Sequence, residues 1–333
     1  MKSSQIVCAA VLFFFTVTLN AQQKDTTLYK EKFAQLDGIS LHYLDFGGSG
    51  LPLIFLQSFH GDAGEWVDYD FKGFAPKFTG TNHVYAITRR GWGKSTDPGW
   101  GYDVATNGED VVAFMDALKI EKAIFAGRIP ASMDMTWIAE HHPNRVAGLV
   151  YFDFVYAYTD LQDSLVRQYV EMLAALTCDL GPDAIRKSMP RSSWRPHFLG
   201  KQEPSINVPA LWFSQEGFYP TMSRELRSFD EYVAEAGKDN AEACDPAALA
   251  YFKKLAKDEA LQKKVKEALQ KANNIPSLMA AFEKAFDPKL KIVKVSQPTQ
   301  QFDSPEAYYK YWQEVESAFY FKHMSEFIKD LER

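Results

Sequence analysis

Three side chains of the types that carry out proton transfer and nucleophilic attack stand out in the sequence: His60, Ser132 and Glu216. An imidazole and a carboxylate in one pocket can act as general acid and base on an ester, a lactone or a similar substrate. His60 is predicted to contact a ligand or to make a local hydrogen bond, and Glu216 to be a solvated loop residue. Ser132 falls in the first turn of a predicted helix, which favours capping or a solvated position over a nucleophilic role.

Other kinds of site have no support in the sequence. The histidines and cysteines fall at no recognised metal-ligand spacing, and no phosphate-cradling glycine-rich loop opens a helix. The net charge is −6, the isoelectric point is near 5.7, and no stretch concentrates lysine and arginine. We therefore expect no metal, no cofactor and no nucleic-acid partner.

The elements that must position these side chains are brief apolar runs alternating with helical patterns. Short runs rich in Val, Ile, Leu and Phe, bounded by turn residues, are typical of strands buried on both faces of a sheet. These runs are residues 51–56, 83–88, 122–126, 146–152, 208–213 and 291–295, and a weakly alternating segment at 36–46 precedes them. Residues 103–118 have the spacing of an amphipathic helix. The alternation predicts an α/β fold with a mostly parallel central sheet and helices on both faces.

Two long segments break this alternation because they contain helical patterns but no strand pattern. Their helical runs include residues 161–176 and 245–271. We interpret the two segments as helical cap insertions over the sheet edge where the carboxyl ends of the strands and ligands meet. The predicted organisation is a first core part at 30–157, a cap insertion at 158–205, a core strand and loop at 206–220, a second insertion at 221–288, and the last strand and C-terminal helix at 289–333.

The first 21 residues read as a signal peptide. Lys2 precedes an apolar run at 6–19, and a polar segment follows Ala21, after which we expect cleavage. The alternative is an uncleaved anchor helix, but the run is shorter than the roughly 20 apolar residues that span a bilayer. No later segment is apolar enough to cross a membrane, so the sequence predicts an exported protein, periplasmic or secreted.

Two cysteines, Cys178 and Cys244, remain after removal of the signal peptide. In an exported protein they can form one disulfide. Two unpaired buried thiols are an equally good reading, and the sequence leaves both open.

Residues 51–154 resemble the α/β-hydrolase fold superfamily. The resemblance rests on four motifs in order: an oxyanion loop at 55–61, a turn at 90–95, a strand leading into 127–131, and a helix end with the next strand start at 139–146. Each motif alone is weak, but their order and spacing over about 100 residues identify the fold. The resemblance implies a serine-hydrolase site on this sheet.

The nucleophile position of that site holds the wrong residue. In the superfamily the strand-to-helix turn reads G-x-S-x-G, with the serine on a sharp elbow, and the matching position here is Ile129. An isoleucine side chain cannot attack a carbonyl, and a β-branched residue is disfavoured at the positive φ of the elbow. Pro130 pushes Ile129 towards an extended conformation, which indicates a rebuilt turn. Pro130 also lacks the N–H that normally stabilises the oxyanion, and such a loss costs about 100- to 1000-fold in rate.

The remaining positions of the implied site are replaced as well. Gln57 and Ser58 stand where the superfamily has His-Gly. Phe218 stands at the acid position, with Glu216 two residues earlier as a substitute. Gln300 lies nearest to the histidine position, and a glutamine cannot exchange a proton near neutral pH.

Several charged residues near these motifs have structural interpretations. Arg128, next to the nucleophile position, is predicted to make a surface salt bridge, with anion binding as the alternative. Arg89 and Arg90 match a structural turn, and His141 and His142 suit the C-terminus of a helix.

The replacements favour a non-catalytic protein, or pseudoenzyme, whose pocket binds a small apolar molecule or a protein partner. One alternative is a hydrolase with a non-standard constellation of His60 and Glu216, and another is a structural or assembly role for the helical insertions. The candidate pocket residues are Gln57, Ser58, Phe59, His60, Arg128, Ile129, Pro130 and Glu216.

Overall fold

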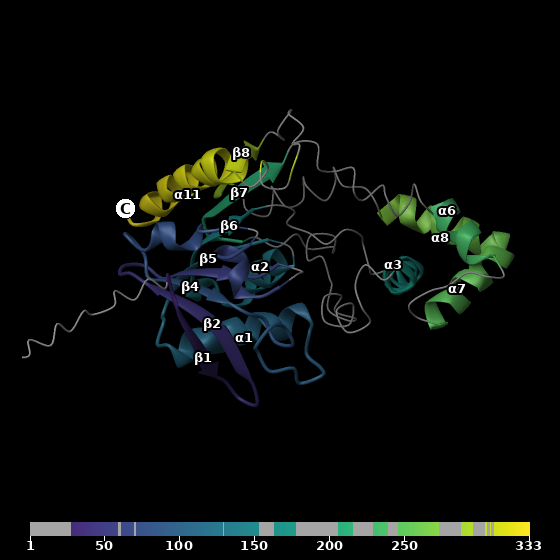
Figure 1. Ribbon diagram of the computed structural model, residues 1–333, viewed down its shortest axis with the longest axis horizontal. Helices are drawn as coiled ribbons and strands as arrows, with labels where there is room; N and C mark the ends of the chain where they lie inside the picture. The colour runs from purple at the N-terminus through teal and green to yellow at the C-terminus, as the bar shows by residue number, and fades with distance from the viewer. Residues whose placement is uncertain are drawn as a thin grey trace, which may run out of the picture.

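An eight-stranded sheet forms the centre of the described part of the chain (Figure 1). The computed structural model describes residues 28–58, 61–69, 71–128, 130–152, 163–177, 206–215, 229–238, 246–272, 288–295, 304, 307 and 310–333. The strands are β1 (Lys30–Gln35), β2 (Ser40–Gly47), β3 (Leu53–Leu56), β4 (Val84–Ile87), β5 (Ala123–Gly127), β6 (Val146–Tyr151), β7 (Ala210–Gln215) and β8 (Leu290–Val295). Their order is β1-β2-β4-β3-β5-β6-β7-β8. The β1–β2 and β2–β4 pairs are antiparallel and all the others are parallel.

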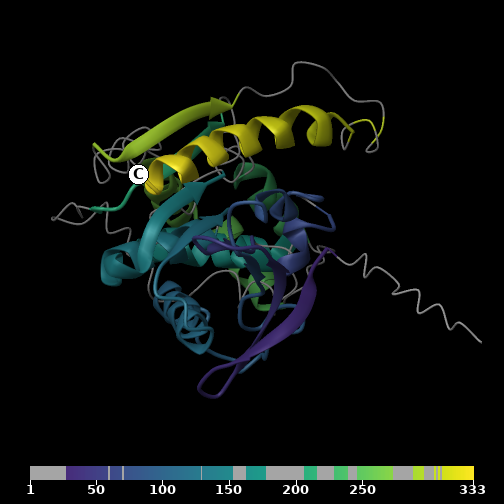
Figure 2. The ribbon, with the colours of Figure 1, turned by 90° about the vertical axis from the view of Figure 1, so that its left-hand side faces the viewer.

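Helices cover both faces of this sheet (Figure 2). The described α-helices are α1 (Val104–Ala117), α2 (Ala131–His141), α3 (Ser164–Thr177), α6 (Phe229–Ala236), α7 (Pro246–Lys257), α8 (Glu259–Ala272) and α11 (Ser317–Leu331). Short 3-10 turns lie at η1 (Ala63–Trp66), η2 (Ala75–Phe78) and η3 (Pro143–Arg145), and a π-helical turn, η6 (Trp312–Glu316), precedes α11.

The two faces of β3 explain how the helices are divided. Successive side chains of a strand point to opposite faces, so Ile54 packs with the core on the α1 and α2 side. Phe55 packs on the other side with Trp66 of η1 and with Met324 of α11. All four residues of β3 are buried. The predicted mostly parallel α/β fold with helices on both faces is confirmed.

Two elements differ from the sequence-based expectation. β1 was not predicted, because five of its six residues are exposed and only Ala34 faces the core. The run at 245–271 is two helices rather than one. The break falls at Asp258, whose side chain accepts the backbone N–H of Leu261 at 2.9 Å and so starts α8.

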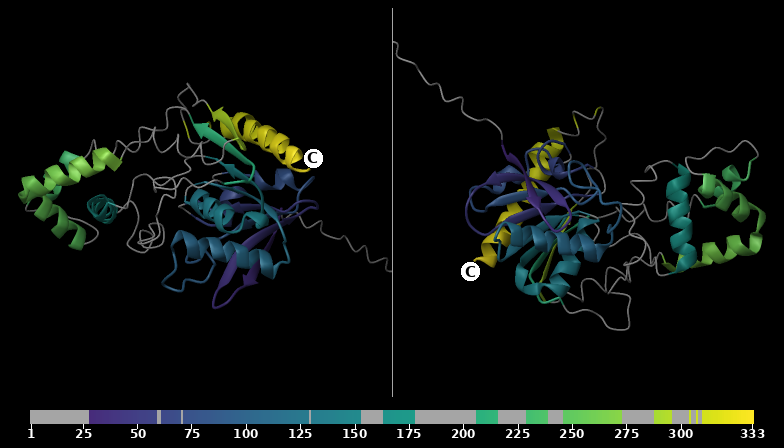
Figure 3. Two further views of the ribbon diagram at one scale, coloured as in Figure 1. Left: turned by 180° about the vertical axis from the view of Figure 1, so that it is seen from behind. Right: turned by 90° about the horizontal axis from the view of Figure 1, so that it is seen from below.

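Helices α3, α6, α7 and α8 share an apolar cluster of their own. Buried side chains of all four helices meet in it, among them Tyr169, Phe229, Phe252 and Leu269. Figures 1 and 3 show the four helices as a group on the side to which the carboxyl end of β7 points. Helices therefore form in both predicted cap insertions, while the exact domain boundaries stay predictions.

None of the described helices is both long and apolar enough to cross a membrane. Residues 1–27 and both Cys178 and Cys244 lie outside the described residues. The signal peptide and the choice between a disulfide and free thiols therefore stay predictions.

Candidate functional site

The turn between β5 and α2 occupies the place of the predicted nucleophile elbow. β5 ends at Gly127 and α2 begins at Ala131, so residues 128–130 alone connect strand and helix. Pro130 is the N-cap residue, with φ −86° and ψ −5°, and no side chain caps the helix. The backbone N–H of Ser132 donates to the carbonyl of Arg128 at 3.0 Å, and that of Met133 donates to Pro130 at 2.9 Å. The turn is thus closed by its own backbone, around a proline that has no N–H to offer.

Ser132 has neither of the roles predicted for it. Its hydroxyl does not cap α2, and its side chain is fully buried, so it is not solvated either. Within the described part of the chain, its Oγ has no hydrogen-bond partner. A nucleophilic serine needs a base within hydrogen-bond reach, and no described side chain provides one at Ser132.

A buried carboxylate lies beside the turn, and the sequence reasoning missed it. Glu65, in η1, is fully buried, and its Oε2 accepts the backbone N–H of Ser58 at 2.6 Å. Its Oε1 lies 3.7 Å from Nη1 of Arg128. In the sequence, Glu65 is one of several acidic residues at 62–70, and nothing there distinguishes it from the others.

Arg128 combines an ion pair with a partly exposed guanidinium. Its side chain is 31% exposed, whereas its partner Glu65 is 0% exposed. The guanidinium carbon lies 5.5 Å from the ring centroid of Phe71, within the range of a cation–π contact. The predicted salt bridge exists, but it joins the surface to a buried carboxylate rather than to another surface residue.

Gln57 connects two loops at the carboxyl edge of the sheet. Its side chain is fully buried. Oε1 accepts the backbone N–H of Arg89 at 2.9 Å, and Nε2 donates to the carbonyl of Gly61 at 3.3 Å. These bonds hold the segment after β3 against the segment after β4. Gln57 therefore fixes the positions of these two loops at the edge of the sheet.

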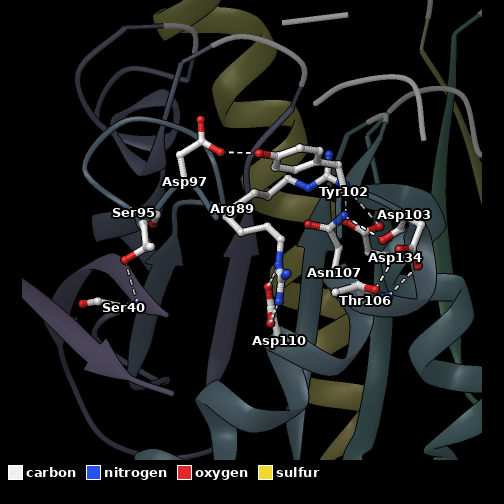
Figure 4. A network of polar contacts seen from close by, with 12 residues as sticks. Ser40, Arg89, Ser95, Asp97, Tyr102, Asp103, Thr106, Asn107, Asp110 and Asp134 are labelled. Atoms are coloured by element: carbon white, nitrogen blue, oxygen red, sulfur yellow. Dashed lines mark hydrogen bonds and ion pairs between the residues drawn. The ribbon is translucent and has the colours of Figure 1, made fainter. Parts of the chain in front are cut away.

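Arg89 and Arg90 anchor the turn after β4 to the helices α1 and α2. Figure 4 shows Arg89, Asp110 and Asp134 within this polar network. Nη2 of Arg89 lies 3.0 Å from Oδ2 of Asp134 in α2, and Nη2 of Arg90 donates to Oδ1 of Asp110 in α1 at 2.6 Å. Burial raises the pKa of Asp110, and it raises the pKa of Asp134 to about 7. The structural role predicted for both arginines is confirmed.

The histidines at the end of α2 are structural, as predicted. Nδ1 of His141 lies 2.9 Å from the carbonyl oxygen of Trp137, and the two rings stack with centroids 4.2 Å apart. Nε2 of His142 lies 3.2 Å from Oε1 of Glu109. Among the described residues, no group of three or more histidine, cysteine, aspartate and glutamate side chains could hold a metal ion.

Six residues singled out by sequence lie outside the described residues. They are Phe59, His60, Ile129, Glu216, Phe218 and Gln300. Their predicted roles, and the extended conformation expected of Ile129, therefore stay predictions.

Comparison with known proteins finds two enzymes that match part of this chain. No family model matches the chain. It is 32% identical over 116 residues to a non-heme chloroperoxidase of Streptomyces lividans, a match that covers 34% of this chain and 41% of that protein. It is also 32% identical over 108 residues to 3-oxoadipate enol-lactonase 2 of Acinetobacter baylyi, covering 32% and 39% of the two chains. Both relatives are α/β-hydrolase-fold enzymes.

The chain has the α/β-hydrolase fold. It spans about two fifths of the length of the curated relatives it matches. Among solved structures, the chain is similar to a loop variant of the haloalkane dehalogenase of Bradyrhizobium elkanii. The alignment covers 91% of this chain and 97% of that protein, with a TM-score of 0.49 and 12% identity.

Proposed function

We propose that this protein is an exported, non-hydrolytic member of the α/β-hydrolase fold superfamily that binds a small apolar molecule. The observation that carries the proposal is Pro130 at the N-cap of α2. In a serine hydrolase of this fold, the residue after the nucleophile donates its backbone N–H to the oxyanion. Pro130 follows Ile129, has no N–H, and leads directly into the helix.

The hydroxyl group that is nearest to this position in the sequence belongs to Ser132. Ser132 lies two residues beyond Pro130, and its Oγ is buried without a partner in the described region. Its backbone N–H is held by the carbonyl of Arg128. An attacking hydroxyl must be reachable by substrate and hydrogen-bonded to a base, and among the described residues Ser132 has no such base.

The turn retains the position where ligands bind in this class of fold. Ligands of parallel α/β sheets bind outside the carboxyl ends of the strands. Arg128 and Pro130 follow the carboxyl end of β5, and Ser58 follows that of β3, the strand beside it. A site that keeps its position but not its nucleophile is suited to binding without bond cleavage.

The test is labelling of the purified mature protein with a fluorophosphonate probe, together with a panel of chromogenic esters. We expect no labelling and no turnover. Because fluorophosphonates modify activated serines, a labelled native chain would overturn the proposal, and mutation of Ser132 would be the next step. Hydrolysis without labelling would favour the alternative constellation of His60 and Glu216.

A matched variant shows whether the scaffold itself could support hydrolysis. The double substitution Ile129→Ser, Pro130→Ala restores a hydroxyl at the nucleophile position and an N–H after it. The variant still lacks the acid and the histidine, so we expect labelling at most weak and slow. The ester panel is run on both proteins at equal concentration.

A further inference from the structure

The first strand of the sheet, β1, is paired on one side only. Among the described strands it pairs with β2 alone, and it stands at the opposite end of the sheet from β8 (Figure 1). We propose that β1 pairs with β1 of a second copy of this chain, antiparallel and centred on Phe33, to form a homodimer. This inference goes beyond the proposed function and does not depend on it.

The backbone of β1 has hydrogen-bonding groups that point away from β2. In β2, the N–H and C=O of both Ser40 and His42 bond to residues 88–96 rather than to β1. Residues directly opposite each other in an antiparallel pair either exchange their hydrogen bonds or both point away. Because Phe33 is opposite His42 and Gln35 is opposite Ser40, Phe33 and Gln35 direct their N–H and C=O groups outwards. Such an edge is a template for another strand.

The side chains of β1 suit association more than their charges suggest. Phe33, in the middle of the strand, is 48% exposed. Charged side chains on an edge strand usually oppose pairing. Here Nζ of Lys32 lies 2.7 Å from Oδ2 of Asp45, and Glu31 pairs with Lys94. These charges are therefore compensated within one copy of the chain, and the large apolar side chain between them and the hairpin turn is left in water.

The sequence of β1 favours a register centred on Phe33. Side chains directly opposite each other in neighbouring strands interact, and opposed like charges destabilise the pair. A two-fold axis at Glu31 or at Lys32 would place that residue opposite its own copy. An axis at Phe33 places two phenylalanines opposite each other, Glu31 opposite Gln35 and Lys32 opposite Ala34. The strand is thus complementary to itself in this register, which is why we assign a second copy of the chain as the partner.

The size of this interface determines how the dimer is measured. Two paired six-residue strands bury less surface than the roughly 1,600 Å² of a standard interface, so the dimer is weak and forms only at high concentration. The test is sedimentation velocity of the purified protein at about 1 μM and at about 200 μM, which bracket a weak association. We expect monomer at the lower concentration and a substantial fraction of dimer at the higher one.

A pair of matched variants separates the two edges of the sheet. Phe33→Lys removes the aromatic pair and places like charges at the two-fold axis, so dimer should be absent at both concentrations. Ile292→Lys makes a similar change at a 39% exposed residue of β8, the other edge strand, and should dimerise as the native protein does. Both residues are exposed, and circular dichroism checks that both variants keep the native fold.

Two changes at Gln35 test the register. Gln35→Lys places a cation opposite Glu31 of the second copy, twice by symmetry, and should tighten the dimer about three- to tenfold. Gln35→Glu places two carboxylates opposite each other at the same positions and should weaken it by a similar factor. Both variants lose the same exposed hydrogen bond from Gln35 to Ser40, so a difference between them reports on the charge alone.

The outcomes decide the proposal. Monomer at both concentrations in the native protein overturns it, as does a dimer that survives Phe33→Lys or is lost in Ile292→Lys. A dimer that needs Phe33 but responds equally to Gln35→Lys and Gln35→Glu overturns the register centred on Phe33.

Discussion

The Nη1 atom of Arg128 and the Oε1 atom of Glu65 lie 3.7 Å apart, yet Glu65 is fully buried and Arg128 is nearly a third exposed. Burying an ionised carboxylate is costly unless a cation and hydrogen bonds compensate it. Glu65 has both, in Arg128 and in the N–H of Ser58. The stability of the loop after β3 should therefore depend on a side chain in the turn after β5.

Removing Arg128 should destabilise the protein more than removing the pair. Arg128→Gln removes the guanidinium beside the buried Glu65 carboxylate, and we expect a loss of about 2 kcal/mol, below the values for fully buried pairs because Arg128 is partly exposed. Glu65→Gln, Arg128→Gln should lose less. The measurement is urea unfolding at pH 7, and equal losses in the two variants would show that the ion pair does not support the loop.

Asp134 should make the native state less stable as the pH rises towards neutrality. Burial raises its pKa to about 7, although Arg89 opposes the shift, whereas an unfolded aspartate has a pKa of about 3.9. Between these values the folded chain keeps a proton that the unfolded chain has released. This contribution to stability is therefore complete below about pH 4 and is lost as the pH rises to about 7.

The matched variant is Asp134→Asn, which imitates the protonated carboxyl group at every pH. It should have nearly native stability at pH 4 and below and should gain progressively on the native protein, on the order of 4 kcal/mol, by pH 8. Denaturant unfolding over this pH range measures the difference. A native protein that gains on the variant as the pH rises would mean that Arg89 holds Asp134 ionised throughout.

His42 should make the native state less stable as the pH falls, which is the opposite of the effect expected for Asp134. Burial lowers its pKa, and the nearby Glu31 only partly offsets this. Nδ1 of His42 lies 2.8 Å from Oγ1 of Thr88, and Nε2 lies 3.2 Å from Oε1 of Glu31, which also pairs with Lys94. Because the folded state favours the neutral ring, its contribution to stability is present above about pH 6.5, the unfolded value, and is lost as the pH falls.

The substitution His42→Asn keeps a polar group near Thr88 but cannot take up a proton. Between pH 6.5 and 5, its stability should fall less than that of the native protein. Thermal unfolding in matched buffers provides the measurement. A parallel decline in the two proteins would assign the acid sensitivity to other groups.

The sequence predicted the sheet well because its central strands are buried on both faces. The residues of β3 and β4 are all buried, so each strand is a continuous apolar run that the pattern reveals. β1 is an edge strand with mostly exposed, charged residues, and such a segment resembles a polar loop. The break at Asp258 was also hidden, because the amphipathic pattern continues from α7 into α8.

The site was only partly predictable, for a different physical reason. The spacing of motifs placed the turn after β5 correctly, since Gly127 and Ala131 end a strand and begin a helix. The partner of Arg128 was not predictable, because Glu65 is 63 residues away along the chain and is brought close only by the pairing of β3 with β5. One acidic residue among several in the sequence does not reveal whether it is solvated or buried.

The signal peptide expected at residues 1–21 can be tested independently of the candidate site. If residues 1–21 are a signal peptide, the mature protein begins at Gln22. Expression of residues 1–333, fractionation and N-terminal sequencing should recover this end from the periplasm or the medium. A chain that retains Lys2 and stays with the membrane would support an anchor helix instead.

Close packing between α1 and α2 makes Gly108 a sensitive position. Glycine inside a helix usually costs about 1 kcal/mol relative to alanine, so a substitution to alanine would ordinarily stabilise the protein. Here a Cβ at residue 108 would lie 2.3 Å from Cε3 of Trp137. We therefore expect Gly108→Ala to lose about 1–3 kcal/mol of unfolding free energy through overpacking.

In a Trp137→Ala background the same change should be neutral or stabilising. A double-mutant cycle by urea unfolding measures the difference, and a loss of equal size in both backgrounds would show that the indole ring is not what excludes the methyl group.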